Sequence, residues 1–300
     1  MTPLPRTNRY EYSIIDRRKD YHWPGNKRLA FYIGTNIEVF AFGTGLGHDP
    51  TKHGEPQTQR NYAWRDYGNR VGVWRYFDML KEFNLKTSCL INSWLYDFHP
   101  EIFERMRQDG HEVVGHGRTN AERQKGLWEI DERRLIQDVT DAVEKHEGRK
   151  PKGWLGAGAA ENSYTPDLLK EAGYTYLLDW PMDDQPIWLK TRAGPLLSVP
   201  YPLELNDAGQ ILWRQHNTRE FCDMLVDQYD EMIQQCVHQP LVCSISLHPY
   251  VVGHPFRLAV VRNVLSHIVN HKHKDRVWFT RAEDIADYCW AMEPGIIPGS

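Results

Sequence analysis

Long apolar runs, blocks of basic residues and closely spaced cysteine pairs are all missing from this 300-residue sequence. No stretch approaches the roughly 20 apolar residues that a membrane-spanning helix requires, and residues 1–6 hold no apolar run of a signal peptide. The net charge is −4 and no basic cluster runs along the chain, which disfavours nucleic acid as a partner. We therefore expect a cytoplasmic protein with neither a membrane nor a nucleic-acid partner.

The cysteines are too few and too scattered to build a disulfide framework. They number five, an odd count, and no two of them form a C-x-x-C pair of the kind that binds zinc through thiolates: Cys89, Cys222, Cys236, Cys243 and Cys289. We expect them to be buried apolar side chains in the core.

What the sequence contains is an alternation of short apolar runs and amphipathic segments. Such alternation predicts a parallel sheet with helices outside it, an α/β fold whose sheet closes or nearly closes into a (β/α) barrel. An open doubly wound sheet is the alternative, but no G-x-G-x-x-G or P-loop motif follows the first strand. We divide the chain into an N-terminal arm (1–27), a barrel domain (28–292) and a C-terminal tail (293–300).

The predicted elements follow one another along most of the chain. Strands are expected at 28–35, 86–92, 112–115, 153–155, 174–178, 241–247 and 277–280. Helices are expected from residue 67 and at 100–109, 131–147, 165–172, 219–236, 255–269 and 282–290. Residues 43–66 are predicted as a long loop, a lid or a subunit contact, because they exceed the usual connection length.

Polar residues cluster where the predicted strands end, which is where ligands bind in parallel α/β folds. Each of them alone could be a satisfied polar side chain at a strand end, but together they predict one pocket: Asn36, Glu38, His116, Arg118, Asn120, Asp183, Asp184 and His248. His116 lies between two glycines, which leaves its imidazole accessible as a base, an acid or a metal ligand. The pair Asp183 and Asp184 either orients a histidine and binds a substrate N–H group or belongs to a turn.

A set of segments in chain order carries a family resemblance. They include Asn36-Ile37-Glu38, the run from Gly110 to Gly117, Gly153-Trp154, the run from Asp183 to Trp188, and Ser244 to His248. The chain resembles the polysaccharide deacetylase (NodB-type) superfamily, and within it the branch of metal-independent allantoinases and cyclic imide hydrolases. The resemblance implies a distorted (β/α) barrel and hydrolysis of carbon–nitrogen bonds, and we add Trp154 and Trp188 to the predicted substrate-binding residues.

The chain departs from the metal-dependent members at the residues that would hold their metal. Those members carry Asp-x-Asp after the first strand and His-x-x-x-His after the third, whereas this sequence has Asn36 with Glu38 and His116 with Asn120. An amide oxygen is a weaker ligand for zinc than an imidazole nitrogen. We therefore expect no cofactor, and a weak divalent ion such as Zn²⁺ between Glu38, His116 and Asn120 remains open.

A second departure concerns an arginine. The allantoinases of this branch carry Gly-Trp-Tyr-Thr-Gly-Arg, whereas here the segment Gly153–Gly158 ends in glycine. An arginine that could orient the substrate or stabilise an oxyanion is therefore missing.

The predicted function is hydrolysis of a small linear or cyclic amide or imide. His116 and Glu38 would transfer protons, His248 or backbone N–H groups would stabilise the oxyanion, and Asp183 would orient a histidine. Asn36, Arg118, Asn120 and Asp184 would bind the substrate. The alternatives are a metal-dependent deacetylase of N-acetylated sugars and a catalytically decayed ligand-binding relative. The arm and the resemblance also suggest a homo-oligomer.

Overall fold

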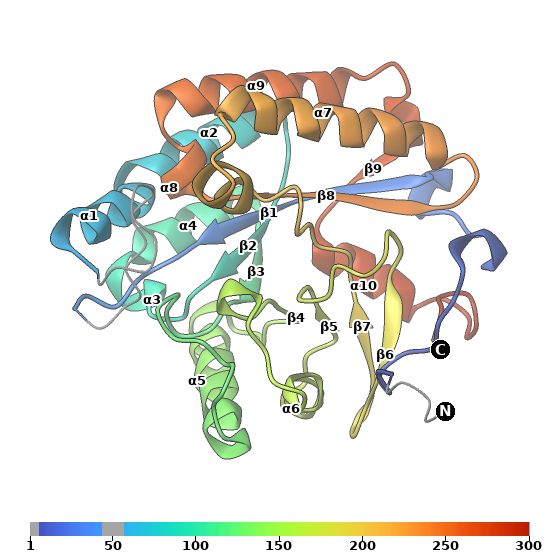
Figure 1. Ribbon diagram of the computed structural model, residues 1–300, viewed down its shortest axis with the longest axis horizontal. Helices are drawn as coiled ribbons and strands as arrows, with labels where there is room; N and C mark the ends of the chain where they lie inside the picture. The colour runs from blue at the N-terminus through green and yellow to red at the C-terminus, as the bar shows by residue number, and fades with distance from the viewer. Residues whose placement is uncertain (1–5, 44–56, 300) are drawn as a thin grey trace.

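The computed structural model describes residues 6–43 and 57–299, which fold around a nine-stranded sheet (Figure 1). The strand order is β6-β7-β5-β4-β3-β2-β1-β8, with β9 paired to β1, and every pairing is parallel except that of β6 with β7. The strands are β1 (Leu29–Ile37), β2 (Ser88–Ile91), β3 (Glu112–Gly115), β4 (Gly153–Trp154), β5 (Tyr176–Leu177), β6 (Ile187–Thr191), β7 (Gly194–Ser198), β8 (Leu241–Leu247) and β9 (Val277–Phe279).

The sheet curls into a half-barrel, and the chain that follows β7 fills the gap beside β8. The Tyr32 hydroxyl donates to the carbonyl of Pro200 at 2.6 Å, and the Ser246 N–H donates to the carbonyl of Leu205 at 2.9 Å. These bonds hold the segment 199–206 across the opening between β7 and β8. The α/β fold and the distorted barrel predicted from the sequence are thereby confirmed.

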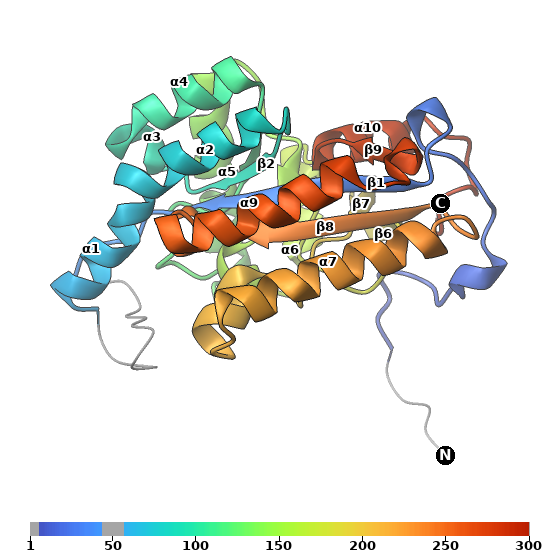
Figure 2. The same cartoon turned by 90° about the horizontal axis from the view of Figure 1, so that it is seen from above.

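Helices cover the outer face of the sheet on both sides in Figure 1, with α7 and α9 opposite α5 and α6. Seen from above, α7 and α9 lie side by side along β8 and β1 (Figure 2). The helices are α1 (Gln59–Tyr67), α2 (Val73–Glu82), α3 (Leu95–Phe98), α4 (Pro100–Asp109), α5 (Glu129–Glu147), α6 (Thr165–Ala172), α7 (Thr218–Gln235), α8 (Pro249–Val252), α9 (Pro255–Asn270) and α10 (Ala282–Trp290). Among these described helices none is long and apolar enough to cross a membrane.

Local sequence signals explain where the helices begin and end. Asn217 and Glu220 form a capping box that begins α7. The side chain of each residue accepts the backbone N–H of the other. Proline at the first position begins α4, and Gly110 in the left-handed conformation ends it.

The two faces of β1 belong to two different parts of the core because successive side chains in a strand point to opposite faces. Leu29, Phe31 and Ile33 pack outward against the helices, whereas Ala30 and Tyr32 pack inside the barrel. The interior cluster also contains residues of α10 and of the N-terminal arm. These segments pack at the end of the barrel where the strands begin, and the pocket lined by the residues that follow β1, β3 and β8 lies at the other end.

The N-terminal arm is an integral part of the barrel rather than a solvated tail in its described portion. Trp23 is 1% exposed, and its indole N–H donates to the carbonyl of Leu241 at 3.0 Å. At the other end of the chain, the carbonyl of Pro298 accepts the N–H of Trp188 at 2.9 Å. Both terminal segments therefore pack against strands of the domain.

Five of these helices and strands were absent from the sequence-based prediction: α1, α3, α8, β6 and β7. The loop predicted at 43–66 ends in helix α1, and residues 44–56 lie outside the described part of the chain. Helix α1 buries Asn61 and Arg65 and so has no apolar stripe, although the Thr58 side chain caps it at the N–H of Asn61, 3.1 Å away. Strand β6 was missed because it pairs only at the edge of the sheet. The five cysteines are all free and buried, as expected.

Candidate active site

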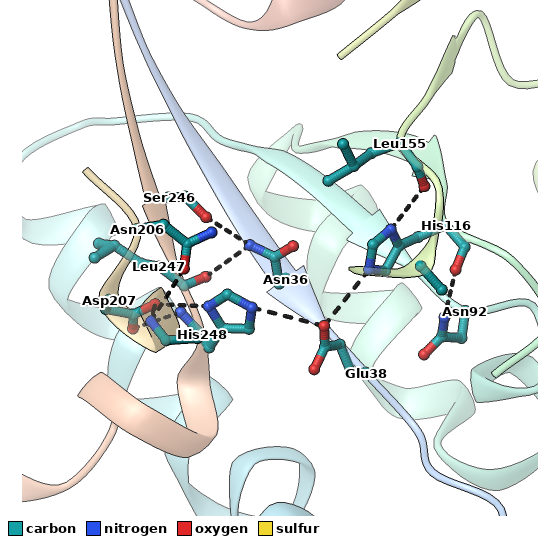
Figure 3. A network of polar contacts seen from close by, with 12 residues as sticks. Asn36, Glu38, Asn92, His116, Leu155, Asn206, Asp207, Ser246, Leu247 and His248 are labelled. Carbon is teal, nitrogen blue, oxygen red and sulfur yellow. Dashed lines mark hydrogen bonds and ion pairs between the residues drawn. The ribbon is translucent and has the colours of Figure 1, made fainter. Parts of the chain in front are cut away.

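Three strands deliver Glu38, His116 and His248 to one point at the open end of the barrel (Figure 3). The Oε1 atom of Glu38 lies 3.5 Å from Nε2 of His116 and 3.6 Å from Nε2 of His248. All three side chains are buried. Because parallel strands end at the same edge of the sheet, Glu38 and His248 meet although they are more than 200 positions apart in the sequence.

His116 is held with one ring nitrogen bound and the other free. Its Nδ1 lies 2.7 Å from the carbonyl oxygen of Leu155, which can only accept, so Nδ1 carries a proton. The Asn92 side chain donates to the backbone carbonyl of His116 at 2.5 Å and fixes the end of β3. Nε2 of His116 faces Glu38 and, among the described residues, has no hydrogen-bond partner. His116 is therefore oriented to accept or give a proton at Nε2.

His248 is held as a cation by two carboxylates. Asp207 accepts the backbone N–H of His248 at 2.8 Å and contacts its Nδ1 at 2.6 Å. Burial opposes the charged imidazole, but Asp207 and Glu38 outweigh it and raise the pKa of His248 to about 10. Burial likewise opposes the charged form of Glu38, yet the charge of His248 and the nearby ring nitrogens of both histidines bring the pKa of that carboxyl below its ordinary value. At neutral pH the pocket contains a carboxylate beside an imidazolium.

Asn36 lies on the wall of the same pocket, two residues before Glu38 in the chain. Its amide nitrogen donates to the hydroxyl oxygens of Tyr201 and Ser246, each at 3.0 Å. These contacts show that the amide at the position of a family aspartate is locked by a hydroxyl network, and they leave no free carboxylate there to act as a base.

Asp179 is a pocket residue that the sequence-based prediction missed. It directly follows the predicted strand 174–178, so the strand-end rule would have found it. Its Oδ1 accepts the N–H of Gly156 at 2.8 Å, one residue after the carbonyl that orients His116. Burial and the neighbouring Glu161 raise the pKa of Asp179 to about 8, so this carboxyl keeps its proton at neutral pH.

The pocket has a volume of about 610 Å³, which suits a small molecule. Buried polar atoms almost always have partners, yet four atoms on the wall of this pocket have none among the described residues. They are Oε2 of Glu38, Nε2 of His116, Oδ1 of Asn120 and Oδ2 of Asp179. Their convergence indicates a site for a polar ligand.

The mouth of the pocket adds cationic and aromatic side chains from outside the strands. Arg65 comes from α1 and lies 3.8 Å above the ring of Phe40, and Arg123 comes from the loop between β3 and α5. Tyr250 from α8 and Trp213 complete this part of the wall. None of these residues follows a predicted strand, and no sequence pattern pointed to them.

Five of the predicted site residues do not line the pocket. Arg118 forms ion pairs with Glu122 and Asp138 on the outer surface, the latter at 2.8 Å. Trp154 is fully buried in the core, with its indole N–H donated to Gln124 at 3.1 Å. These positions do not fit substrate binding.

The segment 183–188 also lies away from His116. Asp183 forms a bidentate ion pair with Arg18 of the arm at 2.6 and 2.7 Å, so it orients no histidine. Asp184 accepts the N–H of Val242 through its backbone carbonyl at 2.9 Å, and the Trp188 ring packs edge-on against Trp290 at 4.5 Å. None of Asp183, Asp184 and Trp188 lines the pocket around His116, which does not fit the catalytic role predicted for Asp183 or the binding roles predicted for Asp184 and Trp188.

The donor atoms in the pocket do not fit a catalytic zinc ion. Glu38 and His116 are strong donors, but the third family position offers only the amide oxygen of Asn120. The proton that His248 directs at Glu38 would compete with a metal cation for the same carboxylate. The described residues contain one group of three histidine, cysteine or acidic side chains whose ligand atoms lie within 4.8 Å of each other. It consists of Asp230 on α7, His267 on α9 and His271 directly after α9.

Comparisons with known proteins find relatives of this chain. Residues 57–177 match the model of the polysaccharide deacetylase family. A candidate polysaccharide deacetylase of Schizosaccharomyces pombe is 25% identical over 97% of this chain and 93% of its own length. The chain is therefore similar to members of the polysaccharide deacetylase superfamily over nearly its whole length.

Solved structures of this superfamily superpose over nearly the whole chain. A candidate polysaccharide deacetylase from Pseudomonas aeruginosa PAO1 is 27% identical with a TM-score of 0.83, covering 92% of this chain and 95% of its own. PuuE allantoinase is 26% identical with a TM-score of 0.83, covering 95% and 99%. The family match and these neighbours support a hydrolase of carbon–nitrogen bonds.

Proposed function

We propose that the protein hydrolyses a carbon–nitrogen bond in a small linear or cyclic amide or imide, without a catalytic metal. The observation that carries this proposal is the group of four buried atoms around the ion pair of Glu38 and His248 that have no hydrogen-bond partner in the described part of the chain. Hydrolysis of an amide needs a base for water, a cation near the developing oxyanion and an acid for the leaving nitrogen. The pocket offers one residue for each task.

His116 is the proposed base. With its proton on Nδ1, it can accept a proton from water at Nε2, while the nearby carboxylate of Glu38 accepts the second O–H of the same water. The water oxygen then forms a bond to the substrate carbonyl carbon, and the proton that it loses moves to Nε2 of His116.

His248 and Asp179 serve the later part of the reaction. The imidazolium of His248 stabilises the negative charge that develops on the substrate oxygen, and Asp207 keeps that imidazolium protonated. Asp179, neutral at pH 7, donates its proton to the leaving nitrogen as the carbon–nitrogen bond breaks. The proton on His116 then returns to Asp179 through solvent, which restores the starting state.

The test is turnover by the purified protein on a panel of hydantoins, dihydropyrimidines, cyclic imides, allantoin and N-acetyl sugars. On any substrate that is cleaved, His116→Ala should lower kcat by ~10²-fold or more, because it removes the acid–base group. The exposed His238→Ala is the matched control and should leave kcat unchanged. Undiminished turnover by His116→Ala contradicts the assignment of the base.

The same panel separates this function from its alternatives. Release of acetate from N-acetyl sugars that depends on a stoichiometric bound metal would show a metal-dependent deacetylase, an outcome motivated by the deacetylase relatives. Elemental analysis of the purified protein measures that metal directly. Binding of panel compounds without turnover would show a decayed site.

A further inference from the structure

The guanidinium group of Arg123 occupies the space of a missing side chain. A Cβ atom built on Gly158 would lie 1.1 Å from Nη1 of Arg123 and 2.3 Å from its Cζ. No side chain at residue 158 is compatible with this placement of Arg123. Gly158 is the position at which the allantoinases of the resembling branch carry an arginine. Here the glycine leaves space for Arg123, an arginine from another loop.

Arg123 is held in place without being neutralised. Its Nη1 donates to the backbone carbonyl of Ala157 at 2.9 Å, which fixes the guanidinium beside the loop that carries Gly156 and Gly158. Among the described residues it forms no ion pair with a carboxylate. An arginine has five N–H groups, so donors remain available on the side of the pocket that Arg123 lines.

The acidic residues nearby do not supply the missing countercharge. Glu38 is paired with the imidazolium of His248, Asp207 is bound to Nδ1 of His248, and Asp179 keeps its proton at neutral pH. Arg65 lines the wall of the same pocket and is a second guanidinium beside Arg123. The repulsion between the two guanidinium groups contributes, after burial, to the lowered pKa of Arg65.

We propose that Arg123 binds a carboxylate group of the substrate, so that the preferred substrates are amides or imides that carry a carboxylate in addition to the bond that is cleaved. A guanidinium suits this role because its planar pair of N–H groups matches the two oxygens of a carboxylate. The reaction in this statement rests on the function proposed above. Recognition of the carboxylate rests on Arg123 and Gly158 alone.

The test compares hydantoin-5-acetate with hydantoin-5-acetamide, which have nearly the same shape and differ in charge. Binding is measured by calorimetry and hydrolysis by release of the ring-opened product. The wild-type protein should bind the charged compound about tenfold or more tightly. Arg123→Ala should abolish that preference while binding of the uncharged compound changes little. An equal loss for both compounds would show that Arg123 only shapes the loop and would overturn the proposal.

The double variant Arg123→Ala/Gly158→Arg is the sharper test, because it moves the guanidinium to the other loop. It should restore the preference for hydantoin-5-acetate, whereas Arg123→Ala/Gly158→Ala, its matched control, should not. Gly158 has a φ of +65°, so the melting temperature of both double variants is measured to confirm folding. A folded double variant that shows no preference for the charged compound refutes the proposal.

Failure of the proposal and failure of the proposed function give different results. Charge-dependent binding without turnover of either compound would uphold the role of Arg123 and contradict the hydrolase. Turnover of hydantoin-5-acetamide as efficient as that of hydantoin-5-acetate would uphold the hydrolase and contradict the carboxylate requirement.

Discussion

Replacing Asp179 by asparagine should make the protein more stable and less active, and the gain in stability should depend on pH. The asparagine oxygen can still accept the N–H of Gly156, which lies 2.8 Å from Oδ1 in the wild-type protein. The change removes an ionisable group that is buried and close to Glu161. It also removes the proposed proton donor for the leaving nitrogen.

The size of the effect follows from the shift in the pKa of Asp179, which burial and Glu161 raise from 3.8 to about 8. Between these values the unfolded chain has released the proton and the folded protein has not, so wild-type stability falls as the pH rises. At pH 7 this pKa shift lowers the free energy of unfolding of the wild-type protein by at most about 4 kcal/mol, because each pKa unit corresponds to ~1.4 kcal/mol. We expect a stability gain of about 1–4 kcal/mol for Asp179→Asn at pH 7, and none below pH 4.

Urea unfolding monitored by circular dichroism at pH 4, 7 and 8 measures this difference, with the exposed Asp97→Asn as the control. The turnover of Asp179→Asn should fall by ~10²-fold if Asp179 is the acid. A stability gain that is the same at pH 4 and pH 8 would refute the argument that the buried carboxyl is the cause. Unchanged turnover would remove Asp179 from the mechanism.

Three further predictions concern the groups around the pocket. Asp207→Asn should lower the pKa of His248 from its wild-type value of about 10, and NMR titration of His248 measures this change. In the wild type the charged histidine contributes stability that is fully present below pH 6.5 and is lost as the pH rises through 10, so in the variant this stability should be lost at a lower pH. Glu161→Gln should lower the pKa of Asp179 and move the alkaline limb of the pH–activity profile to lower pH. Gly115→Ala should destabilise the protein by ~1–3 kcal/mol in urea unfolding, because the new Cβ would lie 2.8 Å from the Trp154 ring.

The sequence could predict the part of the site that the strands deliver. Glu38, His116 and His248 each follow a buried apolar run, and parallel strands end at one edge, so their meeting follows from the fold class. Asp179 obeys the same rule after β5. The two-residue strand is short and its neighbours Asp183 and Asp184 are the more conspicuous acidic pair, which is why the rule was applied to the wrong carboxylates.

The part of the site that comes from loops and helices had no such signal. Arg65 lies on a helix whose buried residues are polar, so neither periodicity nor hydrophobicity distinguishes the face that meets the pocket. In the same way, the sequence near Asp183 shows no cationic partner for its carboxylate. Arg18 in the arm, 165 residues earlier, forms an ion pair with it. Pairings between residues so far apart depend on the folded chain and on nothing in the local sequence.

Gly158 shows how a local comparison of sequences can lead to the wrong conclusion about function. Taken alone, the loss of an arginine at residue 158 suggests a pocket that has lost a substrate-binding charge. In the folded protein the same glycine leaves the space into which Arg123 extends, and the guanidinium remains at the pocket wall on a different loop. A substitution that looks like decay in one segment can therefore be the condition for keeping the charge, and only the positions of both segments in space reveal it.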